Sequence, residues 1–271
     1  MEKTIQELIR KMEEQYNITV LLCCEAGSRE WGLDNPDSDY DIRGFFYHND
    51  KSAYMTAIDS PDSVEQIDFM SKDRIIDFSL WDIKKMFKLL AKSNPSILEW
   101  ALSTIVYYEK PTEMEMIRNV ILKYTCRVPL IYHYLNMSRR NYNRFIKNQM
   151  RVKIKKYAYI IRAQVTALWL IQNSQISQLN KNVQDLIKKV KLPEKTRKLF
   201  DQVVVLKKQQ KSGFGIINSI SDLDQVLSDL QGDLFSQIEK KRNQILKDYE
   251  IEKKTQNKIK FFNKIFFDLI N

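Results

Sequence analysis

Apolar positions in the first hundred residues alternate between a helical spacing and the spacing of strands. Residues 4–15 carry apolar side chains three and four positions apart, which predicts an amphipathic helix, and Thr4 with Glu7 forms a capping-box pattern. A second helix is expected to begin at the cap-like segment 79–82. Between these helices, short apolar runs predict strands near residues 18–24, 41–47, 64–69 and 73–78. This alternation predicts a small mixed sheet backed by helices.

After Pro95 the strand spacing disappears and helical spacing continues to the end of the chain. Residues 150–172 give the cleanest apolar stripe, and no apolar run is long enough for a membrane span. The amphipathic segment 259–267 is expected to pack back on the body or to meet a partner, with a membrane contact as the less favoured alternative. We therefore predict an α+β protein, with a mixed-sheet catalytic domain over residues 1–108 followed by a basic α-helical domain over residues 109–271.

Charge is distributed unevenly along the 271 residues, whose formal net charge is +10. Residues 1–109 contain 12 Lys and Arg against 20 Asp and Glu, a net of −8, whereas residues 110–271 contain 32 against 14, a net of +18. A strongly basic second half is typical of a protein that binds a polyanion such as RNA or a nucleoside triphosphate. The alternative is that these lysines simply form the solvated faces of helices.

The residues that point to chemistry lie between the first two predicted strands. Gly27-Ser28 follows an apolar strand, and Asp39-Tyr40-Asp41 comes eleven residues after Ser28. Ser28 is placed to cap a short helix whose first N–H groups would bind an anion. Asp39 and Asp41 would share one face of a strand, where two carboxylates repel unless a cation such as Mg²⁺ lies between them. A phosphate cradle beside a carboxylate pair indicates metal-assisted phosphoryl transfer.

This pattern resembles the DNA polymerase β-type nucleotidyltransferase superfamily, whose signature is Gly-Ser, then Asp-x-Asp, then a third carboxylate. The longer sequence pattern is similar to one branch of that superfamily, a family of predicted nucleotidyltransferases. Some of its members are encoded beside RNA ligases and are thought to act in RNA repair. The similarity extends from about residue 18 to about residue 170. It is carried by Gly27-Ser28-Arg29-x-Trp31-Gly32, Pro36-Asp37-Ser38-Asp39-Tyr40-Asp41-x-Arg43, Ser93-Asn94-Pro95 with Leu98-Glu99-Trp100, and Lys155-Lys156-Tyr157.

The resemblance implies roles for further residues. Asp77, at the end of a predicted strand, falls where the third carboxylate is expected, and Asp68 is the second choice. Asp39, Asp41 and Asp77 would together hold two Mg²⁺ ions, with Mn²⁺ as the alternative metal. The nucleotide would be bound by Gly27, Ser28, Lys155, Lys156 and Tyr157, the lysines meeting the triphosphate and the tyrosine the base.

Two simpler interpretations of these side chains remain open at this point. Asp77 can instead be an ordinary aspartate near a helix entry, and the lysines can be part of a solvated surface. Arg43, next in the row of Asp39 and Asp41, is expected to form a structural ion pair. With two histidines and no Cys-x-x-Cys motif, a structural zinc site is not expected.

The implied reaction is transfer of a nucleoside monophosphate from a nucleoside triphosphate, with ATP expected, to the 3′ hydroxyl of an RNA, releasing pyrophosphate. An acceptor hydroxyl on a partner protein, as in AMPylation, is the alternative. A catalytically silent relative that binds RNA or a partner is a third, and the presence of all three candidate carboxylates argues against it. The residues from Met1 to Thr4 show no secretory pattern, which predicts an intracellular protein, cytoplasmic or nuclear.

Overall fold

The computed structural model describes residues 1–55, 64–73, 75–210, 215–253 and 258–270. Contacts divide the chain into two compact units. The first contains Met1–Gly27, Asp39–Thr125 and Lys253–Asn271, and the second contains Ser28–Ser38 and Cys126–Glu252. This division differs from the predicted domains 1–108 and 109–271, because residues 109–125 and the C-terminal segment belong with the sheet. Residues 28–38, inside the predicted catalytic domain, belong with the helical unit.

The first unit is built on a five-stranded mixed sheet in the order β3-β4-β2-β1-β5. β2 and β4 are parallel, and the other neighbours are antiparallel. The predicted α+β class is thereby confirmed. The strands are β1 (Ile18–Glu25), β2 (Tyr40–His48), β3 (Gln66–Met70), β4 (Ile76–Asp82) and β5 (Val106–Glu109).

The last two strands of this sheet, β4 and β5, differ from the prediction. The strand predicted over 73–78, which includes the undescribed Arg74, begins at Ile76 and continues to Asp82. Ser79 therefore lies inside β4, and the side chain of Asp82 caps the next helix by accepting a hydrogen bond from Lys84 N at 2.7 Å. β5 was not predicted, because the strand has only four residues and none of them is buried, so no alternation marks it.

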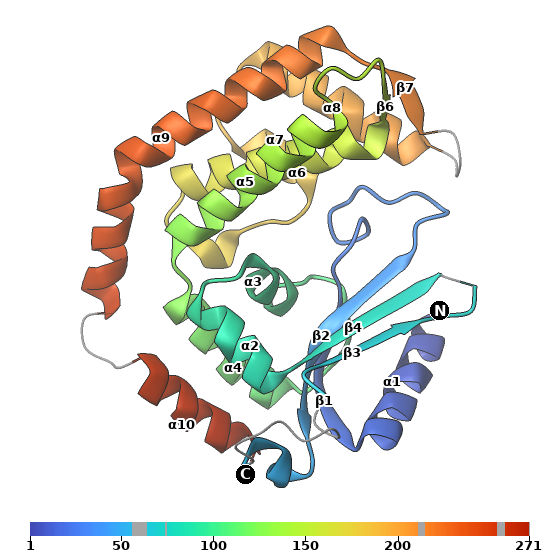
Figure 1. The fold of residues 1–271 in the computed structure, drawn as a ribbon, viewed down its shortest axis with the longest axis vertical. Coiled ribbons are helices and arrows are strands. Elements are labelled where there is room, and N and C mark those ends of the chain that lie inside the picture. Colours follow the sequence, from blue (N-terminus) through green and yellow to red (C-terminus); the bar gives the residue numbers. More distant parts are fainter. Residues whose placement is uncertain (56–63, 74, 211–214, 254–257, 271) are drawn as a thin grey trace. The chain divides into compact units, whose positions relative to one another are not determined.

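Helices cover both faces of this sheet (Figure 1). α1 (Glu2–Tyr16) packs on the face formed by Ile42, Phe46 and Phe78. The predicted helix is therefore confirmed, but its N-cap is Met1 and has no side-chain cap, so the capping box is wrong. The other face is covered by α2 (Ile83–Ala91), α3 (Pro95–Ala101) and α4 (Pro111–Tyr124).

Alternation along β2 decides what each face can do. Because successive strand residues point to opposite faces, Ile42 and Phe46 point toward α1, and Asp41, Arg43 and Phe45 point the other way. Phe45 packs against Trp100 of α3, with ring centroids 5.6 Å apart. The polar half of this second face, at the start of β2 and β4, is thus available for chemistry.

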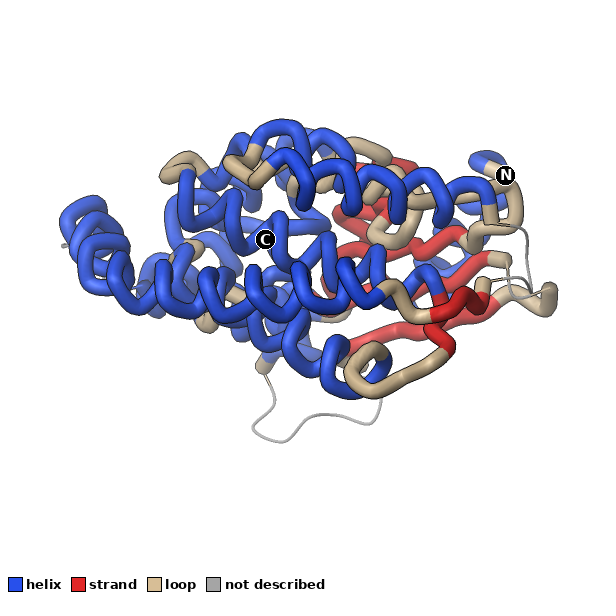
Figure 2. Tube along the Cα trace, turned by 90° about the horizontal axis from the view of Figure 1, so that it is seen from above, coloured by secondary structure: helices blue, strands red, loops and turns tan. Residues whose placement is uncertain are grey.

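The second unit is helical, as predicted, apart from a hairpin formed by β6 (Arg151–Lys153) and β7 (Ile216–Asn218). α6 (Ile154–Gln172) is buried on almost every side, as expected of a helix in the middle of a core. It confirms a helix within the predicted range 150–172, but residues 151–153 form β6, so the helix begins at Ile154. Around it lie α5 (Arg127–Phe145), α7 (Val183–Lys189), α8 (Glu194–Gln209) and α9 (Ser221–Lys253). Figure 2 shows helices in blue and strands in red. Within the described residues, no helix has the length and apolar content required to cross a membrane.

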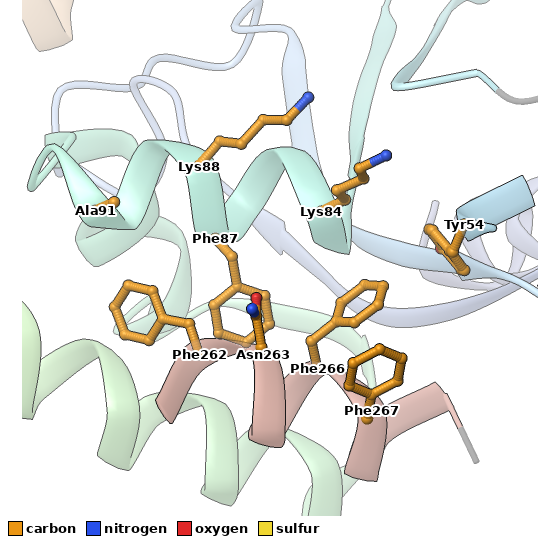
Figure 3. A pocket seen from close by; sticks show the side chains of 9 residues that line it. All are labelled: Tyr54, Lys84, Phe87, Lys88, Ala91, Phe262, Asn263, Phe266 and Phe267. Atoms are coloured by element: carbon orange, nitrogen blue, oxygen red, sulfur yellow. The ribbon is translucent and has the colours of Figure 1, made fainter. Parts of the chain in front are cut away.

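The C-terminal helix α10 (Lys258–Ile270) packs back on the first unit, which confirms the first of the expectations for residues 259–267. Phe262 lies 5.4 Å from Phe87 of α2, measured between ring centroids, and Phe266 lies 5.0 Å from Tyr54. Between α2 and α10 is a cavity of about 410 Å³ with mainly aromatic walls (Figure 3). Its described lining contains no carboxylate, so this cavity does not match the predicted metal site.

The contact between β1 and β2 at Gly44 predicts a clear difference between two glycine substitutions. A Cβ on Gly44 would lie 1.7 Å from the carbonyl oxygen of Leu22, whereas a Cβ on Gly232 in α9 would meet no atom within 4 Å. We expect Gly44→Ala to lower the free energy of unfolding by about 1–3 kcal/mol through overpacking. Gly232→Ala should raise it by about 0.5–1 kcal/mol, since alanine favours the helix. Urea unfolding measures both, and equal effects would contradict this packing.

Candidate active site

The turn after β1 differs from the predicted helix. Residues 28–32 form a turn closed by two backbone hydrogen bonds, from Leu33 N to Ser28 O at 2.8 Å and from Gly32 N to Arg29 O at 3.1 Å. Gly32 has a left-handed backbone, with φ of 62°, which ends the turn before a helix can develop. Ser28 therefore caps no helix, and the predicted cradle of helical N–H groups is wrong.

Gly27 lies directly against the carboxylate of Asp41. A Cβ at position 27 would lie 1.8 Å from Asp41 Oδ2, and Ala26 N donates a hydrogen bond to Asp41 O at 2.9 Å. Any side chain at position 27 would therefore displace the carboxylate. The structure brings together the first and last parts of the Gly-Ser…Asp-x-Asp motif and explains why a glycine is required.

Asp77 is the register partner of Asp41 in the parallel ladder of β2 and β4. The prediction put Asp77 at the end of a strand, whereas it lies near the start of β4. The pairing still brings it beside Asp41. Arg43 Nη2 lies 2.7 Å from Asp77 Oδ2 and 3.4 Å from Asp41 Oδ1. The expected ion pair of Arg43 is confirmed. About a third of each carboxylate side chain is exposed, 34% for Asp41 and 32% for Asp77.

Opposing effects act on the pKa of Asp41. Burial raises its pKa above the usual range, the Arg43 guanidinium opposes that rise, and the carboxylates of Asp77 and Asp39 add to it. Asp39 is exposed and lies one residue before β2, so strand pairing does not fix it as it fixes Asp41. The site therefore concentrates negative charge that Arg43 only partly offsets.

Glu25 is a site residue that the sequence analysis missed. This buried carboxylate accepts hydrogen bonds from Gly27 N at 3.0 Å and Asp41 N at 3.1 Å through Oε1, and from the Tyr107 hydroxyl at 2.9 Å through Oε2. Burial raises the pKa of Glu25 despite these bonds. It connects the ends of β1, β2 and β5. Its only signal in the sequence is an acidic residue at the end of an apolar strand, two positions before Gly27.

The described residues contain no group of three or more His, Cys, Asp or Glu side chains arranged to hold a metal ion. Arg43 is bonded to both Asp41 and Asp77, so the predicted three-carboxylate centre for two ions is not assembled by these side chains alone. Proteins usually bind Mg²⁺ through one or two carboxylates, with substrate phosphates and water completing the shell. The exposed carboxylate of Asp39 and the partly exposed carboxylate of Asp41 offer oxygen donors that would fit the ion in that form, as part of a metal–phosphate complex.

The predicted lysines lie in a basic cluster of the second unit, formed by Arg144, Lys153, Lys155, Lys156 and Lys207. Lys155 is exposed at the start of α6, whereas Lys156 Nζ lies 3.7 Å from the ring centroid of Phe145. Burial and then the charge of Lys155 lower the pKa of both Lys156 and Lys207. Lys207, in α8, is only 7% exposed and was missed because nothing nearby in the sequence marks it.

Two other candidates have structural contacts. Tyr157 is fully buried, its hydroxyl donates to Asp224 Oδ1 at 2.6 Å, and burial with this bond raises its pKa to about 12. The expectation that Tyr157 contacts a base is therefore wrong, because its ring belongs to the core. Asp68, the second choice for the third carboxylate, lies one strand farther out on β3, opposite Ser79, and is hydrogen-bonded to Gln66.

Comparisons with known proteins relate the chain to a described family. The model of the RNA repair pathway DNA polymerase beta family matches residues 1–260. The chain is 34% identical over 180 residues to the uncharacterised protein YcgL of Bacillus subtilis strain 168, covering 66% of this chain and 67% of that protein. A nucleotidyltransferase-like protein from Exiguobacterium sibiricum 255-15, solved by crystallography, aligns with 88% of this chain and 75% of its own. Its identity is 10% and its TM-score 0.32, which supports no conclusion about the fold.

The raised pKa of Glu25 predicts a pH-dependent effect of Glu25→Gln. As pH rises above the unfolded value of about 4.3, the unfolded chain loses this proton before the folded protein does, so the native glutamate costs stability. Glutamine avoids that cost. We expect Glu25→Gln to unfold at a higher urea concentration than the wild type at pH 7, and this gain to disappear below about pH 4.

A sign control is available in the same unit. Lys88 lowers the pKa of the exposed Glu65 by a hydrogen bond, so Glu65→Gln should lose stability at pH 7, by no more than about 1 kcal/mol. A gain for Glu25→Gln that is the same at both pH values would contradict the assignment.

Proposed function

Because the chain belongs to the RNA repair pathway DNA polymerase beta family, we propose that it is a Mg²⁺-dependent nucleotidyltransferase. It would move a nucleoside monophosphate from a nucleoside triphosphate, with ATP expected, to the 3′ hydroxyl of an RNA. The observation that supports this proposal most directly is the pairing of Asp41 with Asp77 beside Gly27. In this arrangement two carboxylates lie together where β2 and β4 begin. Because Gly27 has no side chain, the carboxylate of Asp41 has room to lie there.

In the proposed reaction the acceptor oxygen forms a bond to the α-phosphorus, and the bond from that phosphorus to the β-phosphate oxygen breaks. Pyrophosphate leaves with the electron pair of the broken bond, and the carboxylate of Asp77 accepts the hydroxyl proton. Arg43 orients Asp77 through its bonds to Oδ2 and to the main-chain oxygen, at 2.7 and 2.8 Å. Asp39 and Asp41 would hold Mg²⁺, and the bound ion would offset phosphate charge and lower the pKa of the hydroxyl.

The basic cluster of the second unit supports a substrate rich in phosphate. The charged forms of Lys156 and Lys207 are disfavoured by burial and by neighbouring cations, and an added phosphate would relieve that repulsion. We expect RNA binding to weaken steeply with salt, because each neutralised phosphate releases counterions. A protein acceptor would not require this cluster.

The test is transfer of α-labelled nucleotide to a short RNA ending in a 3′ hydroxyl, in the presence of Mg²⁺. We expect Asp41→Asn to lower the transfer rate about a thousandfold, because several kcal/mol of charge stabilisation are lost. Asp68→Asn is the matched control, since Asp68 is a carboxylate of the same sheet outside the proposed site. Its rate should remain close to that of the wild type.

The acceptor is decided by where the label goes. Label on the RNA that is lost when the terminal 3′ hydroxyl is replaced by phosphate supports the proposal, as does loss of transfer with EDTA. Label on a protein band from a cell extract, with none on RNA, would replace the RNA acceptor by a protein hydroxyl. Equal rates for Asp41→Asn and the wild type, or no transfer of any of the four nucleotides to RNA, would overturn the proposal.

A further inference from the structure

Residues 28–38 join two residues of the candidate active site, since Gly27 precedes the segment and Asp39 follows it. We call these residues the connecting segment. Although both neighbours belong to the first unit, the connecting segment itself belongs to the second. Its contacts within the second unit therefore bear on how the active-site motif is held.

The first of these contacts is a buried ion pair. Lys181 Nζ lies 2.6 Å from Glu30 Oε1, and the two side chains are only 5% and 2% exposed. Removing one partner of an ion pair this deeply buried is strongly destabilising as a rule. The next residue, Asn182, caps α7 and also lies against Gly32, where a Cβ would be 2.2 Å from Asn182 Nδ2.

Trp31 makes the second set of contacts. The guanidinium carbon of Arg162, a buried residue of α6, lies 3.9 Å from the ring centroid of Trp31, and Tyr159 meets the indole edge-on at 5.5 Å. Trp31 O accepts a hydrogen bond from Val183 N at 3.0 Å. Farther along, Asn35 Nδ2 donates to Gln210 O at 2.8 Å. Contacts with α6, with the start of α7 and with the residue after α8 thus hold the connecting segment.

We propose, on the basis of the proposed function, that Lys181 is a positioning residue that holds Asp39 for catalysis through the connecting segment. Asp41 is fixed by the pairing of β2 with β4, but Asp39 lies before β2 and continues directly from this segment. Lys181 does not touch the reacting atoms. It acts by anchoring Glu30, so that Asp39 reaches the geometry in which it can hold the metal–nucleotide complex.

This role differs from a purely stabilising one in what it predicts. Misplacing a catalytic group by about 1 Å can lower a rate by about a hundredfold. Loss of stability alone lowers the amount of folded enzyme but leaves the activity of each folded molecule unchanged. A positioning role therefore changes kcat per folded molecule and the Mg²⁺ concentration that gives half-maximal rate.

The test compares Lys181→Met with Arg127→Met. Arg127 is also in the second unit, where its Nη1 donates to Leu170 O at 3.2 Å and to Asn173 O, at the end of α6 and just after it. For Lys181→Met we expect faster hydrogen exchange in residues 28–38 and kcat lower by about ten- to a hundredfold. The Mg²⁺ concentration for half-maximal rate should also rise. Arg127→Met should lose stability, with kcat per folded molecule unchanged.

The double variant Glu30→Gln/Lys181→Met keeps the test available if Lys181→Met does not fold, because no unpaired charge remains buried. Unchanged exchange in residues 28–38, or the same change in kcat for Lys181→Met and Arg127→Met, would overturn the positioning role. If the wild type transfers no nucleotide, the proposed function fails and catalytic positioning fails with it. The exchange rates would then still show whether Lys181 anchors the connecting segment.

Discussion

The parallel pairing of β2 with β4 is the constraint on which the candidate site depends. It places Asp41 opposite Asp77, and two carboxylates in that position repel each other unless a cation is present. Arg43, two residues farther along β2, supplies the resident positive charge from the same face. Gly27 then leaves room for the Asp41 carboxylate, and the buried Glu25 ties the turn after β1 to the start of β2. The pairing of the strands, and not the turn after β1 alone, therefore brings these charged side chains together.

The two units divide the proposed chemistry between them. The sheet unit carries the carboxylates and Arg43, whereas the helical unit carries the basic cluster and the anchors of the connecting segment. The chain passes between the units on both sides of that segment, at Gly27–Ser28 and at Ser38–Asp39. The Gly-Ser…Asp-x-Asp motif is therefore not local to the sheet. Its two halves are joined by residues whose own packing is that of the helical unit, which gives residues such as Lys181 a route to influence catalysis without touching a substrate.

Much of the sheet and the carboxylate pair could be predicted from the sequence, because alternation in residues 18–24 and 41–47 is strong. The motif also pointed to Asp41 and Asp77, which the structure pairs across β2 and β4, although the position of Asp77 within its strand was wrong. What could not be predicted depends on long-range packing. The left-handed backbone of Gly32 ends the turn at Ser28 before a helix can form. The hydroxyl of the buried Tyr157 is hydrogen-bonded to Asp224, 67 residues farther along the chain. Lys207 of α8 lies near Lys155 of α6, although the two are far apart in the sequence. The partners of Glu25 and Lys181 are likewise distant in the sequence: Glu25 is bonded to Tyr107, and Lys181 to Glu30. Local spacing does not reveal such contacts.

The most direct test of the central claim is the mass of a defined RNA after incubation with Mg²⁺ and a single nucleoside triphosphate. The proposed reaction predicts a gain of whole nucleoside monophosphates at a 3′ hydroxyl end, with one pyrophosphate released for each monophosphate added. It also predicts no gain for an RNA that ends in a 3′-deoxy nucleotide. An RNA of unchanged mass, with the triphosphate either intact or merely hydrolysed, would contradict the claim that this pair of carboxylates serves nucleotidyl transfer to RNA.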